Sequence, residues 1–308
     1  MNRREFLKYC AKISLLFTGS ALFADRFAEA FMRIGEGRIN ILWLQGQACS
    51  GDSVSLVYGD SPEVPQLIMN IINLKFQPVV SVAQGDLVMR IIEEELKNKD
   101  YILCFEGAVP YKMMGACKIG EYYLVDILKR AINSSVAVVA VGTCASYGGI
   151  PAANKETGSI SVVDFMKREG LNKPYVRLPG CPTNSIRITG TVAYIVGFQK
   201  LPRLDKDHRP KLYYPDIIHN NCQRFQYFVQ DKFVEDYNQK RECLFKMGCK
   251  GPITYADCPL RRYNRNTSWC VDANTPCIGC ANPKFPFDPE KGIYTDPKSI
   301  NPKEDIIG

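Results

Sequence analysis

Several features are scarce or missing in this 308-residue sequence, and each absence argues against a class of protein. No basic run with interleaved aromatic side chains is present, which argues against nucleic-acid binding. The net charge is +7, and the first thirty residues, with five basic and three acidic side chains, account for +2 of it. After those residues no long apolar run remains that would predict a membrane span. Histidine is scarce, with only two residues.

The first thirty residues have the pattern of an export signal. The charged start "NRREFLK" is followed by an apolar run over 13–24 and by "AEA" at 28–30. The paired arginines before Phe-Leu-Lys resemble a twin-arginine signal, which carries folded proteins across the membrane. The alternative is a fortuitous basic amphipathic helix. We expect residues 1–30 to be a signal and the mature chain to lie on the periplasmic side. Any membrane association would then come through a partner.

Residues 31–205 are predicted to form a flavodoxin-like α/β domain. Short strand-like runs alternate with amphipathic helical patterns, which is typical of a parallel sheet with helices on its faces. The predicted strands are 39–44, 78–83, 101–107, 136–142 and 175–180. The helical patterns are 64–74, 85–99, 120–133, 161–170 and 183–198.

Cysteine is abundant, with thirteen residues. Disulfide scaffolds reach this density mainly in short chains, so metal binding is the better interpretation. Cys49, Cys144 and Cys181 each follow a predicted strand. Ligands of open parallel sheets bind at the carboxyl ends of the strands, so these three thiols are expected to converge there. Three strand-end cysteines could also occur by chance.

Residues 206–308 are predicted to form a second domain with little regular structure. Only 223–239 has a helical pattern, while prolines, aromatics and cysteines crowd together. Metal clusters can organise such a segment, because their binding energy becomes folding energy. The candidate ligands in this segment are His219, Cys222, Cys243, Cys249, Cys258, Cys270, Cys277 and Cys280.

Taken together, the motifs resemble the small subunit of nickel–iron hydrogenase. They are, in chain order, "WLQGQACSG", "EGAVP", "GTCASYGG", "PGCPTN", "HNNCQR", "GCKGP" and "PCIGC". The resemblance implies an electron-transferring subunit with three iron–sulfur clusters. Its partner would be a separate large subunit that carries the nickel–iron centre. The electron acceptor would be a c-type cytochrome or a quinone-linked membrane subunit.

The resemblance also implies which residues bind each cluster. The proximal cluster would be held by Cys49, Cys144 and Cys181, with Asp52 at the position where most members have cysteine. The distal cluster would be held by His219, Cys222, Cys243 and Cys249. The medial cluster would be held by Cys258, Cys277 and Cys280, with Cys270 where most members have a proline.

A ligand count favours three 4Fe-4S clusters. Cys104 is expected to be a buried, inert thiol, and Cys117 matches no known ligand position. The remaining ten mature cysteines, with Asp52 and His219, give twelve ligands, or four for each cluster. Two alternatives stay open. In the first, the medial cluster is 3Fe-4S and the Cys270 thiol binds no iron. In the second, the Asp52 side chain faces solvent and binds no iron.

One oxygen-insensitive branch of the family has a proximal cluster held by three cysteines and one aspartate, which Asp52 matches. The oxygen-tolerant branch adds two cysteines around that cluster, but here those positions are Gly51 and Gly149. Glu106 is expected to be a buried, hydrogen-bonded structural carboxylate, and His208 an exposed loop residue.

Two other functions are alternatives for a chain with these cysteines. A stand-alone iron–sulfur carrier or redox sensor would use the same fold without a nickel-bearing partner. An exported disulfide protein is disfavoured because the cysteines gather at strand ends.

Overall fold

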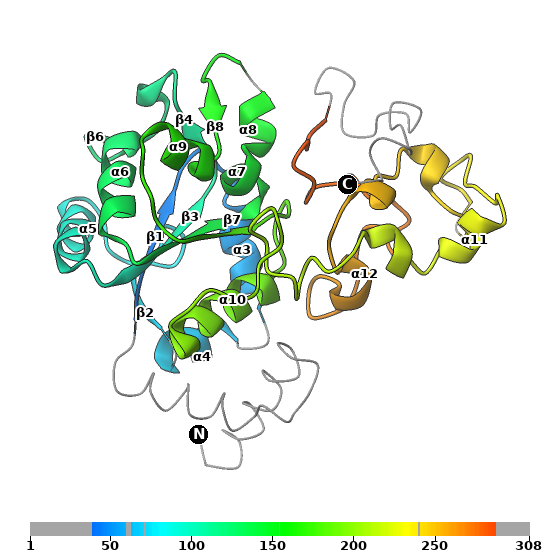
Figure 1. Cartoon of the computed structure of the whole chain (residues 1–308), viewed down its shortest axis with the longest axis horizontal. Coiled ribbons are helices and arrows are strands. Elements are labelled where there is room, and N and C mark those ends of the chain that lie inside the picture. The colour runs from blue at the N-terminus through cyan, green and yellow to red at the C-terminus, as the bar shows by residue number, and fades with distance from the viewer. Residues whose placement is uncertain (1–38, 60–62, 71, 154, 240, 288–308) are drawn as a thin grey trace, which may run out of the picture.

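The computed structural model describes residues 39–59, 63–70, 72–153, 155–239 and 241–287. Figure 1 shows a lobe built around a sheet beside a second lobe formed by the later part of the chain. The predicted export signal over 1–30 lies outside the described residues, and the domain boundary at 205 stays a prediction. None of the helices in the described ranges combines the length and apolar character that crossing a membrane requires.

Five parallel strands form the central sheet in the order β2-β1-β3-β7-β9. The strands are β1 (Asn40–Gln45), β2 (Asn73–Phe76), β3 (Tyr101–Glu106), β7 (Ala137–Val141) and β9 (Tyr175–Leu178). Numbered along the chain, this is the 2-1-3-4-5 order of flavodoxin-like folds. The predicted fold class is confirmed.

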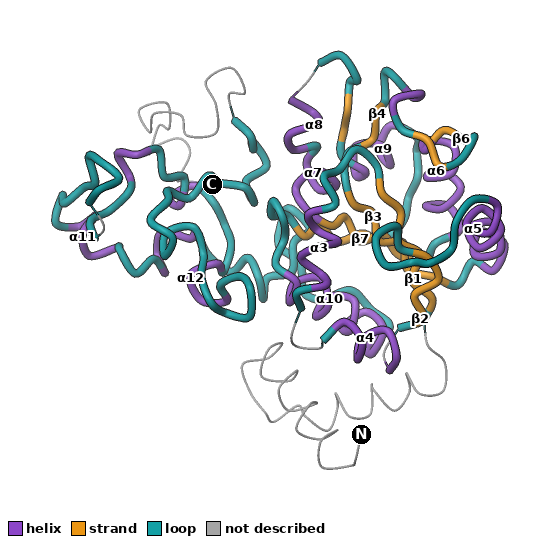
Figure 2. Tube along the Cα trace, turned by 180° about the vertical axis from the view of Figure 1, so that it is seen from behind, coloured by secondary structure: helices purple, strands orange, loops and turns teal. Residues whose placement is uncertain are grey.

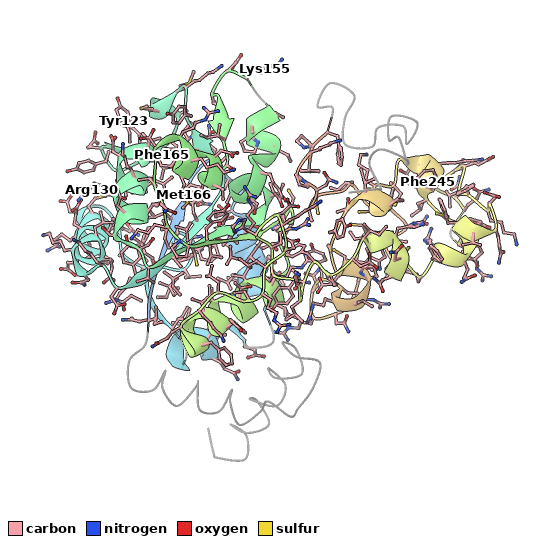
Figure 3. The ribbon with its side chains drawn as sticks, in the orientation of Figure 1. Tyr123, Arg130, Lys155, Phe165, Met166 and Phe245 are labelled. Atoms are coloured by element: carbon pink, nitrogen blue, oxygen red, sulfur yellow. The ribbon has the colours of Figure 1, made fainter. Side chains whose placement is uncertain are left out.

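Helices cover both faces of the sheet, because successive strand side chains point to opposite sides. Leu42, Leu103 and Val138 face one apolar core, to which α5 (Asp86–Asn98), α6 (Leu124–Ser134) and α9 (Val162–Arg168) contribute. Ile41, Ile102 and Val139 face a second core, formed with α3 (Gly51–Val57), α4 (Val64–Asn70) and α10 (Ser185–Phe198). Figure 3 labels Phe165 and Met166 of α9, both buried in the first core.

Shorter elements decorate the strand ends of this lobe. They are α7 (Gly142–Tyr147), α8 (Gly149–Ala153), η2 (Met114–Ala116) and the pairs β4 (Val109–Pro110) with β8 (Ser159–Ile160) and β5 (Lys118–Ile119) with β6 (Tyr122–Tyr123). The helix α7 begins directly where β7 ends, so the backbone reverses tightly at the sheet edge.

The second lobe is mostly loop, as Figure 2 shows. Its described helices are short: η3 (Ile218–Asn221), α11 (Phe225–Val229), η4 (Phe245–Met247), η5 (Gly251–Ile253) and α12 (Cys258–Arg261). A small core holds it together, in which candidate ligands such as Cys258 and Cys277 pack with Tyr213, Leu244 and Trp269. The apolar core of this lobe therefore surrounds the candidate metal ligands.

Some predicted elements are wrong or too long. The predicted strand over 78–83 is a loop, and the second strand is β2 instead. The helix predicted over 64–74 ends at Asn70, and its last residues belong to β2. The side chain of Gln77 accepts hydrogen bonds from the backbone N–H groups of Val79 and Val80, at 2.7 and 2.8 Å, which folds the chain into a turn. The helix predicted over 223–239 ends at Val229, and Asp231 follows with a left-handed φ of 53°.

Candidate metal centres

The proximal ligands lie on three loops that leave the carboxyl edge of the sheet. Cys49 follows β1, Cys144 lies in the first turn of α7 after β7, and Cys181 follows β9. Burial raises the pKa of the Cys144 thiol to about 12, and the charges of Cys181, Asp52 and Cys49 add to that rise. Burial also raises the pKa of Cys181 to about 11, with the same two neighbours, Asp52 and Cys49, contributing. The fold therefore brings these four side chains together.

Asp52 is buried at this edge, with 8% of its surface exposed. The backbone N–H of Thr183 donates to its Oδ1 at 2.7 Å. Burial raises the pKa of the carboxyl to about 8, against the lowering effect of the Thr183 hydrogen bond, and the charge of Glu106 raises it further. The alternative in which Asp52 faces solvent does not fit this burial.

Glu106, at the end of β3, fixes the start of α3. Its Oε1 accepts hydrogen bonds from the backbone N–H groups of Asp52 and Ser53, at 3.1 and 3.3 Å. Its Oε2 accepts from Trp43 Nε1 at 3.3 Å and from the Ser53 hydroxyl. The expected buried, hydrogen-bonded carboxylate is confirmed. It holds in place the turn that carries Cys49 and Asp52.

Two glycines lie directly against the proximal sulfurs. A Cβ on Gly149 would lie 2.9 Å from Cys144 Sγ, and one on Gly51 would lie 3.0 Å from Cys49 Sγ. Gly149 also has a positive φ of 54°. A side chain at either position would therefore have to displace a candidate ligand. These are the positions where the oxygen-tolerant branch is expected to have cysteine.

The medial candidates form a second group, in which Cys258 and Cys277 are buried and Cys270 and Cys280 are half-buried. Burial raises the pKa of the Cys277 thiol, and the charges of Cys249, Cys280 and Cys270 raise it further. Burial likewise raises the pKa of Cys280, and the charges of Cys258 and Cys270 raise it further. The charge of Cys270 thus raises the pKa of both Cys277 and Cys280, so Cys270 lies near the other medial candidates.

The distal candidates line one small cavity in the second lobe. His219, Cys222, Cys243 and Cys249 all contribute to its wall. Burial lowers the pKa of His219, which favours the neutral imidazole that binds metals. Phe228 packs edge-on against the same ring, with centroids 4.5 Å apart. All four predicted distal ligands are brought together.

Hydrogen bonds join neighbouring groups. The hydroxyl of Thr143, the residue before the proximal candidate Cys144, donates to the carbonyl oxygen of Cys280, a medial candidate. The same hydroxyl accepts from the backbone N–H of Gly180, the residue before Cys181, at 2.9 Å. The backbone N–H of Lys250, the residue after the distal candidate Cys249, donates to the carbonyl oxygen of Cys277, a medial candidate, at 2.7 Å. The three groups are thus consecutive neighbours.

The donor set fits iron–sulfur clusters better than single ions or disulfides. Within the described ranges no three His, Cys, Asp or Glu side chains lie close enough to hold one metal ion. All twelve cysteines in those ranges have free thiols. Trp269 lines the distal cavity, and its Nε1 is buried without a hydrogen-bond partner among the described residues. Cluster sulfides are hydrogen-bond acceptors. The cavity thus offers a donor that such a cluster can use.

The residues set aside as non-ligands lie elsewhere. Cys104 is fully buried in β3, and burial alone raises its pKa to about 12. Cys117 packs against the first core of the sheet lobe. His208 is exposed in a turn and stacks on Tyr175, with ring centroids 4.3 Å apart. All three match the expectations from the sequence.

Three residues that touch a candidate site, Arg187, Thr143 and Trp269, were not predicted from the sequence. Arg187 Nη2 lies 3.3 Å from Cys258 Sγ. One signal was available for it, since a lone arginine in the apolar helix α10 must find a buried partner. Thr143 and Trp269 carry no comparable signal, because their contacts depend on how the loops pack.

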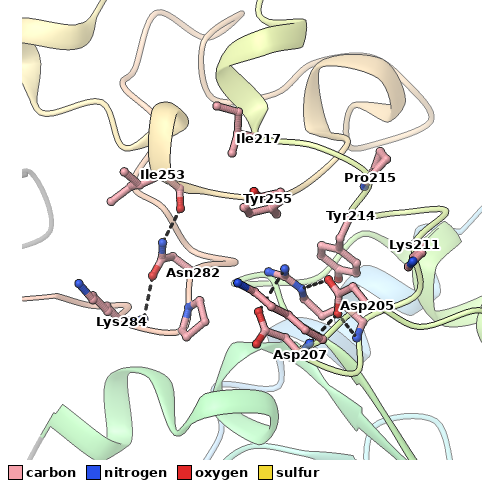
Figure 4. Close-up of a pocket in the computed structure, with 13 residues that line it drawn as sticks. Asp205, Asp207, Lys211, Tyr214, Pro215, Ile217, Ile253, Tyr255, Asn282 and Lys284 are labelled. Carbon is pink, nitrogen blue, oxygen red and sulfur yellow. Dashed lines mark hydrogen bonds and ion pairs between the residues drawn. The ribbon is translucent and has the colours of Figure 1, made fainter. Parts of the chain in front are cut away.

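A larger cavity, of about 660 Å³, contains none of the predicted ligands (Figure 4). Charged side chains line it, and several pair with one another. Arg209 binds Asp205 at 2.7 Å and Asp207 at 3.2 Å. Asn282 donates to the carbonyl oxygen of Ile253 on its other wall.

Comparisons with known proteins agree with the geometry. A family model described as the C-terminal part of NiFe/NiFeSe hydrogenase small subunits matches residues 214–291. A model described as the 20 kDa subunit of NADH ubiquinone oxidoreductase matches residues 49–195. The second match covers most of the predicted flavodoxin-like domain.

Whole-chain relatives agree too. The periplasmic [NiFeSe] hydrogenase small subunit of Desulfomicrobium baculatum is 36% identical, over 93% of this chain and 96% of that protein. The periplasmic [NiFe] hydrogenase small subunit 1 of Nitratidesulfovibrio vulgaris is 32% identical, over 96% of this chain and 93% of that protein. A solved structure of the Dm. baculatum [NiFeSe]-hydrogenase superimposes with a TM-score of 0.79 and 36% identity, covering 84% of this chain and 99% of that chain.

Fold, free thiols and relatives lead to the same conclusion, and the stand-alone carrier is not needed to explain them. The chain belongs to the nickel–iron hydrogenase small-subunit family, and it is the iron–sulfur, electron-transferring partner of a large hydrogenase subunit.

Proposed function

We propose that this chain relays electrons from the large subunit through three iron–sulfur clusters held by its own residues. The proximal ligands are Cys49, Asp52, Cys144 and Cys181. The medial ligands are Cys258, Cys270, Cys277 and Cys280. The distal ligands are His219, Cys222, Cys243 and Cys249. When bound, the clusters supply one-electron transfer at potentials set by ligand type, burial and hydrogen bonds to sulfur.

One observation carries this proposal: hydrogen bonds join the segments that hold adjacent groups of candidate ligands. The Thr143 hydroxyl, next to the proximal Cys144, donates to the carbonyl oxygen of the medial Cys280. The backbone N–H of Lys250, next to the distal Cys249, donates to the carbonyl oxygen of the medial Cys277 at 2.7 Å. The medial group is therefore bonded to both of the others. A chain that only stored iron would not need its sites in such an order.

All three clusters are proposed to be 4Fe-4S. Support comes from the burial of Asp52 beside Cys144 and Cys181, and from the position of Cys270 among the medial thiols. A medial 3Fe-4S cluster, with Cys270 unbound, is the alternative. His219 replaces a negative thiolate by a neutral ring at the distal site, which raises that site's potential.

The residues around the ligands orient them and exclude water. Glu106 holds the turn that carries Cys49 and Asp52, and Thr183 fixes the Asp52 carboxylate. Phe225 and Phe228 pack on the His219 ring at 5.1 and 4.5 Å, which limits its rotation. These contacts therefore orient Asp52 and His219, one ligand in each of two sites.

The acceptor is proposed to be a c-type cytochrome or a quinone-linked membrane subunit on the periplasmic side. The predicted twin-arginine signal supports this placement. So do the relatives from Desulfomicrobium baculatum and Nitratidesulfovibrio vulgaris, both named as periplasmic.

Metal analysis of the purified complex tests the proposal. After subtraction of the partner's own iron, about twelve irons in this chain, with nickel in the co-purifying large chain, fit three 4Fe-4S clusters. About eleven irons would favour a medial 3Fe-4S cluster. A solitary brown protein without a nickel-bearing partner, or a colourless protein, would contradict the proposal.

A further inference from the structure

Arg187 is a fully buried charged residue that the ligand assignment does not use. It lies in α10, on the sheet lobe, whereas its principal partners Asp257 and Cys258 lie at the start of α12 in the second lobe. Burying a guanidinium is costly unless charge and hydrogen bonds compensate it. The contacts of Arg187 therefore indicate what this charge is for.

The guanidinium is held in one position. Its Nε and Nη2 both donate to Asp257 Oδ1, at 3.1 and 2.7 Å. Its guanidinium carbon lies over the ring of Tyr214, 5.0 Å from the centroid. Burial opposes the charge on Arg187, but Asp257, Tyr214 and Cys258 hold its pKa well above the ordinary value. Arginine stays protonated in this setting.

One donor of this fixed group points at a candidate cluster ligand. Arg187 Nη2 lies 3.3 Å from Cys258 Sγ. Sulfur is a large acceptor, so this separation is an ordinary N–H···S hydrogen bond. It is also charge-assisted, because the donor is cationic and a ligating cysteine is a thiolate.

The local charge balance is positive. Asp257 neutralises one unit, but it is shared, because Arg261 Nε also binds its Oδ2. Two arginines therefore face one carboxylate next to Cys258. The surplus positive charge acts through a buried region, where screening by water is weak.

We propose that Arg187 is a positioning residue that raises the reduction potential of the cluster held by Cys258 and fixes that ligand. The inference rests on the proposed function, since it takes Cys258 as a medial ligand. Reduction adds one electron to the cluster, and a cation with an N–H donor at the sulfur stabilises the reduced state more than the oxidised state. A 4Fe-4S medial cluster is expected to have a lower potential than a 3Fe-4S one. Arg187 offsets part of that drop.

The test is an EPR-monitored redox titration of the intact two-subunit complex. Arg187→Met keeps the length and apolar stem of the side chain but removes its charge and donors. At a fixed potential the ratio of reduced to oxidised medial cluster is expected to fall about tenfold, a downward shift of about 59 mV for one electron. Arg187→Lys keeps the charge but loses the planar fork, so its shift is expected to be smaller.

Asp257→Asn predicts a shift of opposite sign. The substitution removes one negative charge while Tyr214 still stacks on Arg187 and Pro179 O still accepts from its Nη1, at 3.5 Å. The medial potential is expected to rise. A purely structural role for the Arg187–Asp257 pair would not give two variants with opposite shifts.

Arg209→Met is the matched control. Arg209 is also buried, at 3% exposure, pairs with Asp205 and Asp207, and stacks on Tyr214. No cysteine is among its contacts in the described residues. This variant is expected to lose stability but to leave every midpoint potential unchanged.

Each outcome separates the two proposals. An unchanged medial potential in Arg187→Met with full iron content overturns the inference and leaves the proposed function intact. Cys258→Ala with unchanged iron content and EPR signals overturns the ligand assignment itself. If Arg187→Met cannot hold its iron, Arg187→Lys and Asp257→Asn decide, and unchanged potentials in both reject the inference.

Discussion

The carboxylate of Asp52 lies so close to Gly142 that a side chain at position 142 would collide with it. A Cβ on Gly142 would come within 1.9 Å of Asp52 Oδ2. Gly142 also has a φ of 79°, in the left-handed region that glycine adopts without strain. The reversal from β7 into α7 and the position of Asp52 thus depend on the same residue.

Gly142→Ala is expected to damage the proximal site beyond a simple backbone effect. The alanine must push Asp52 away from Cys144 and Cys181 while adopting an unfavourable φ. Gly170→Ala is the control, because Gly170 has a φ of 65° with nothing within 4 Å of its added Cβ. The control should cost about 1 kcal/mol of unfolding free energy. Thermal unfolding and iron content measure both, and equal effects in the two variants would contradict the prediction.

Asp52→Asn and Asp52→Cys separate a ligand from a structural carboxylate. Asparagine keeps the size of the side chain and an oxygen for the 2.7 Å hydrogen bond from Thr183, but it loses the charge that binds iron. We expect Asp52→Asn to lose about one iron from the proximal site, and Asp52→Cys to retain four. Iron analysis and the EPR spectrum of the reduced complex provide the measurement. Full iron and an unaltered proximal signal in Asp52→Asn would show that Asp52 is not a ligand.

Cys270→Pro is expected to convert the medial cluster to 3Fe-4S. The proline removes the fourth thiolate, so the iron that Cys270 holds is lost and a 3Fe-4S EPR signal appears in the oxidised complex. Total iron should fall by about one per chain. Cys117→Ala is the control, since Cys117 packs against the sheet-lobe core away from all three sites. An oxidised spectrum that does not change in Cys270→Pro refutes the assignment.

The sheet and the positions of the proximal cysteines were predictable because local sequence decides them. Short, largely apolar strands end at Gln45, Val141 and Leu178, and the three proximal cysteines follow within a few residues. Parallel strands bring their carboxyl ends to one edge whatever the loops do. The fold class therefore predicted the convergence of Cys49, Cys144 and Cys181 before the structure showed it.

Predictions failed where a side chain or one backbone angle overrides local preference. The valines at 79, 80 and 82 favour a strand, yet Val82 is 92% exposed because Gln77 folds the chain into a turn. The helix after Arg224 stops near Asp231, which has a left-handed φ. The helical periodicity of the surrounding sequence gives no sign of that backbone angle. Arg187 shows a third limit. Its contact with Cys258 joins positions 71 residues apart, which only tertiary packing decides.

Glu106 is expected to be essential to the proximal turn without binding iron. Glu106→Ala would leave buried donors on Asp52, Ser53 and Trp43 without their acceptor. Each unsatisfied buried donor costs about 1–3 kcal/mol, so a loss of about 3 kcal/mol or more in unfolding free energy is predicted. Glu106→Gln keeps one acceptor oxygen but turns an N–H₂ toward groups that are themselves donors, so its loss should be intermediate.

The control for Glu106 is Glu93→Gln, which breaks an ion pair with Arg130 at 2.6 Å on a solvent-facing surface of α5 and α6. Such exposed pairs contribute less than about 1 kcal/mol, so this variant should unfold close to the parent. Denaturant unfolding gives the stabilities, and iron analysis shows whether the proximal cluster survives. Because Glu106 acts by fixing the N–H groups at positions 52 and 53, Glu106→Ala should release proximal iron while the medial and distal EPR signals persist. Loss of all three signals together would instead point to collapse of the whole chain and contradict a role confined to this turn.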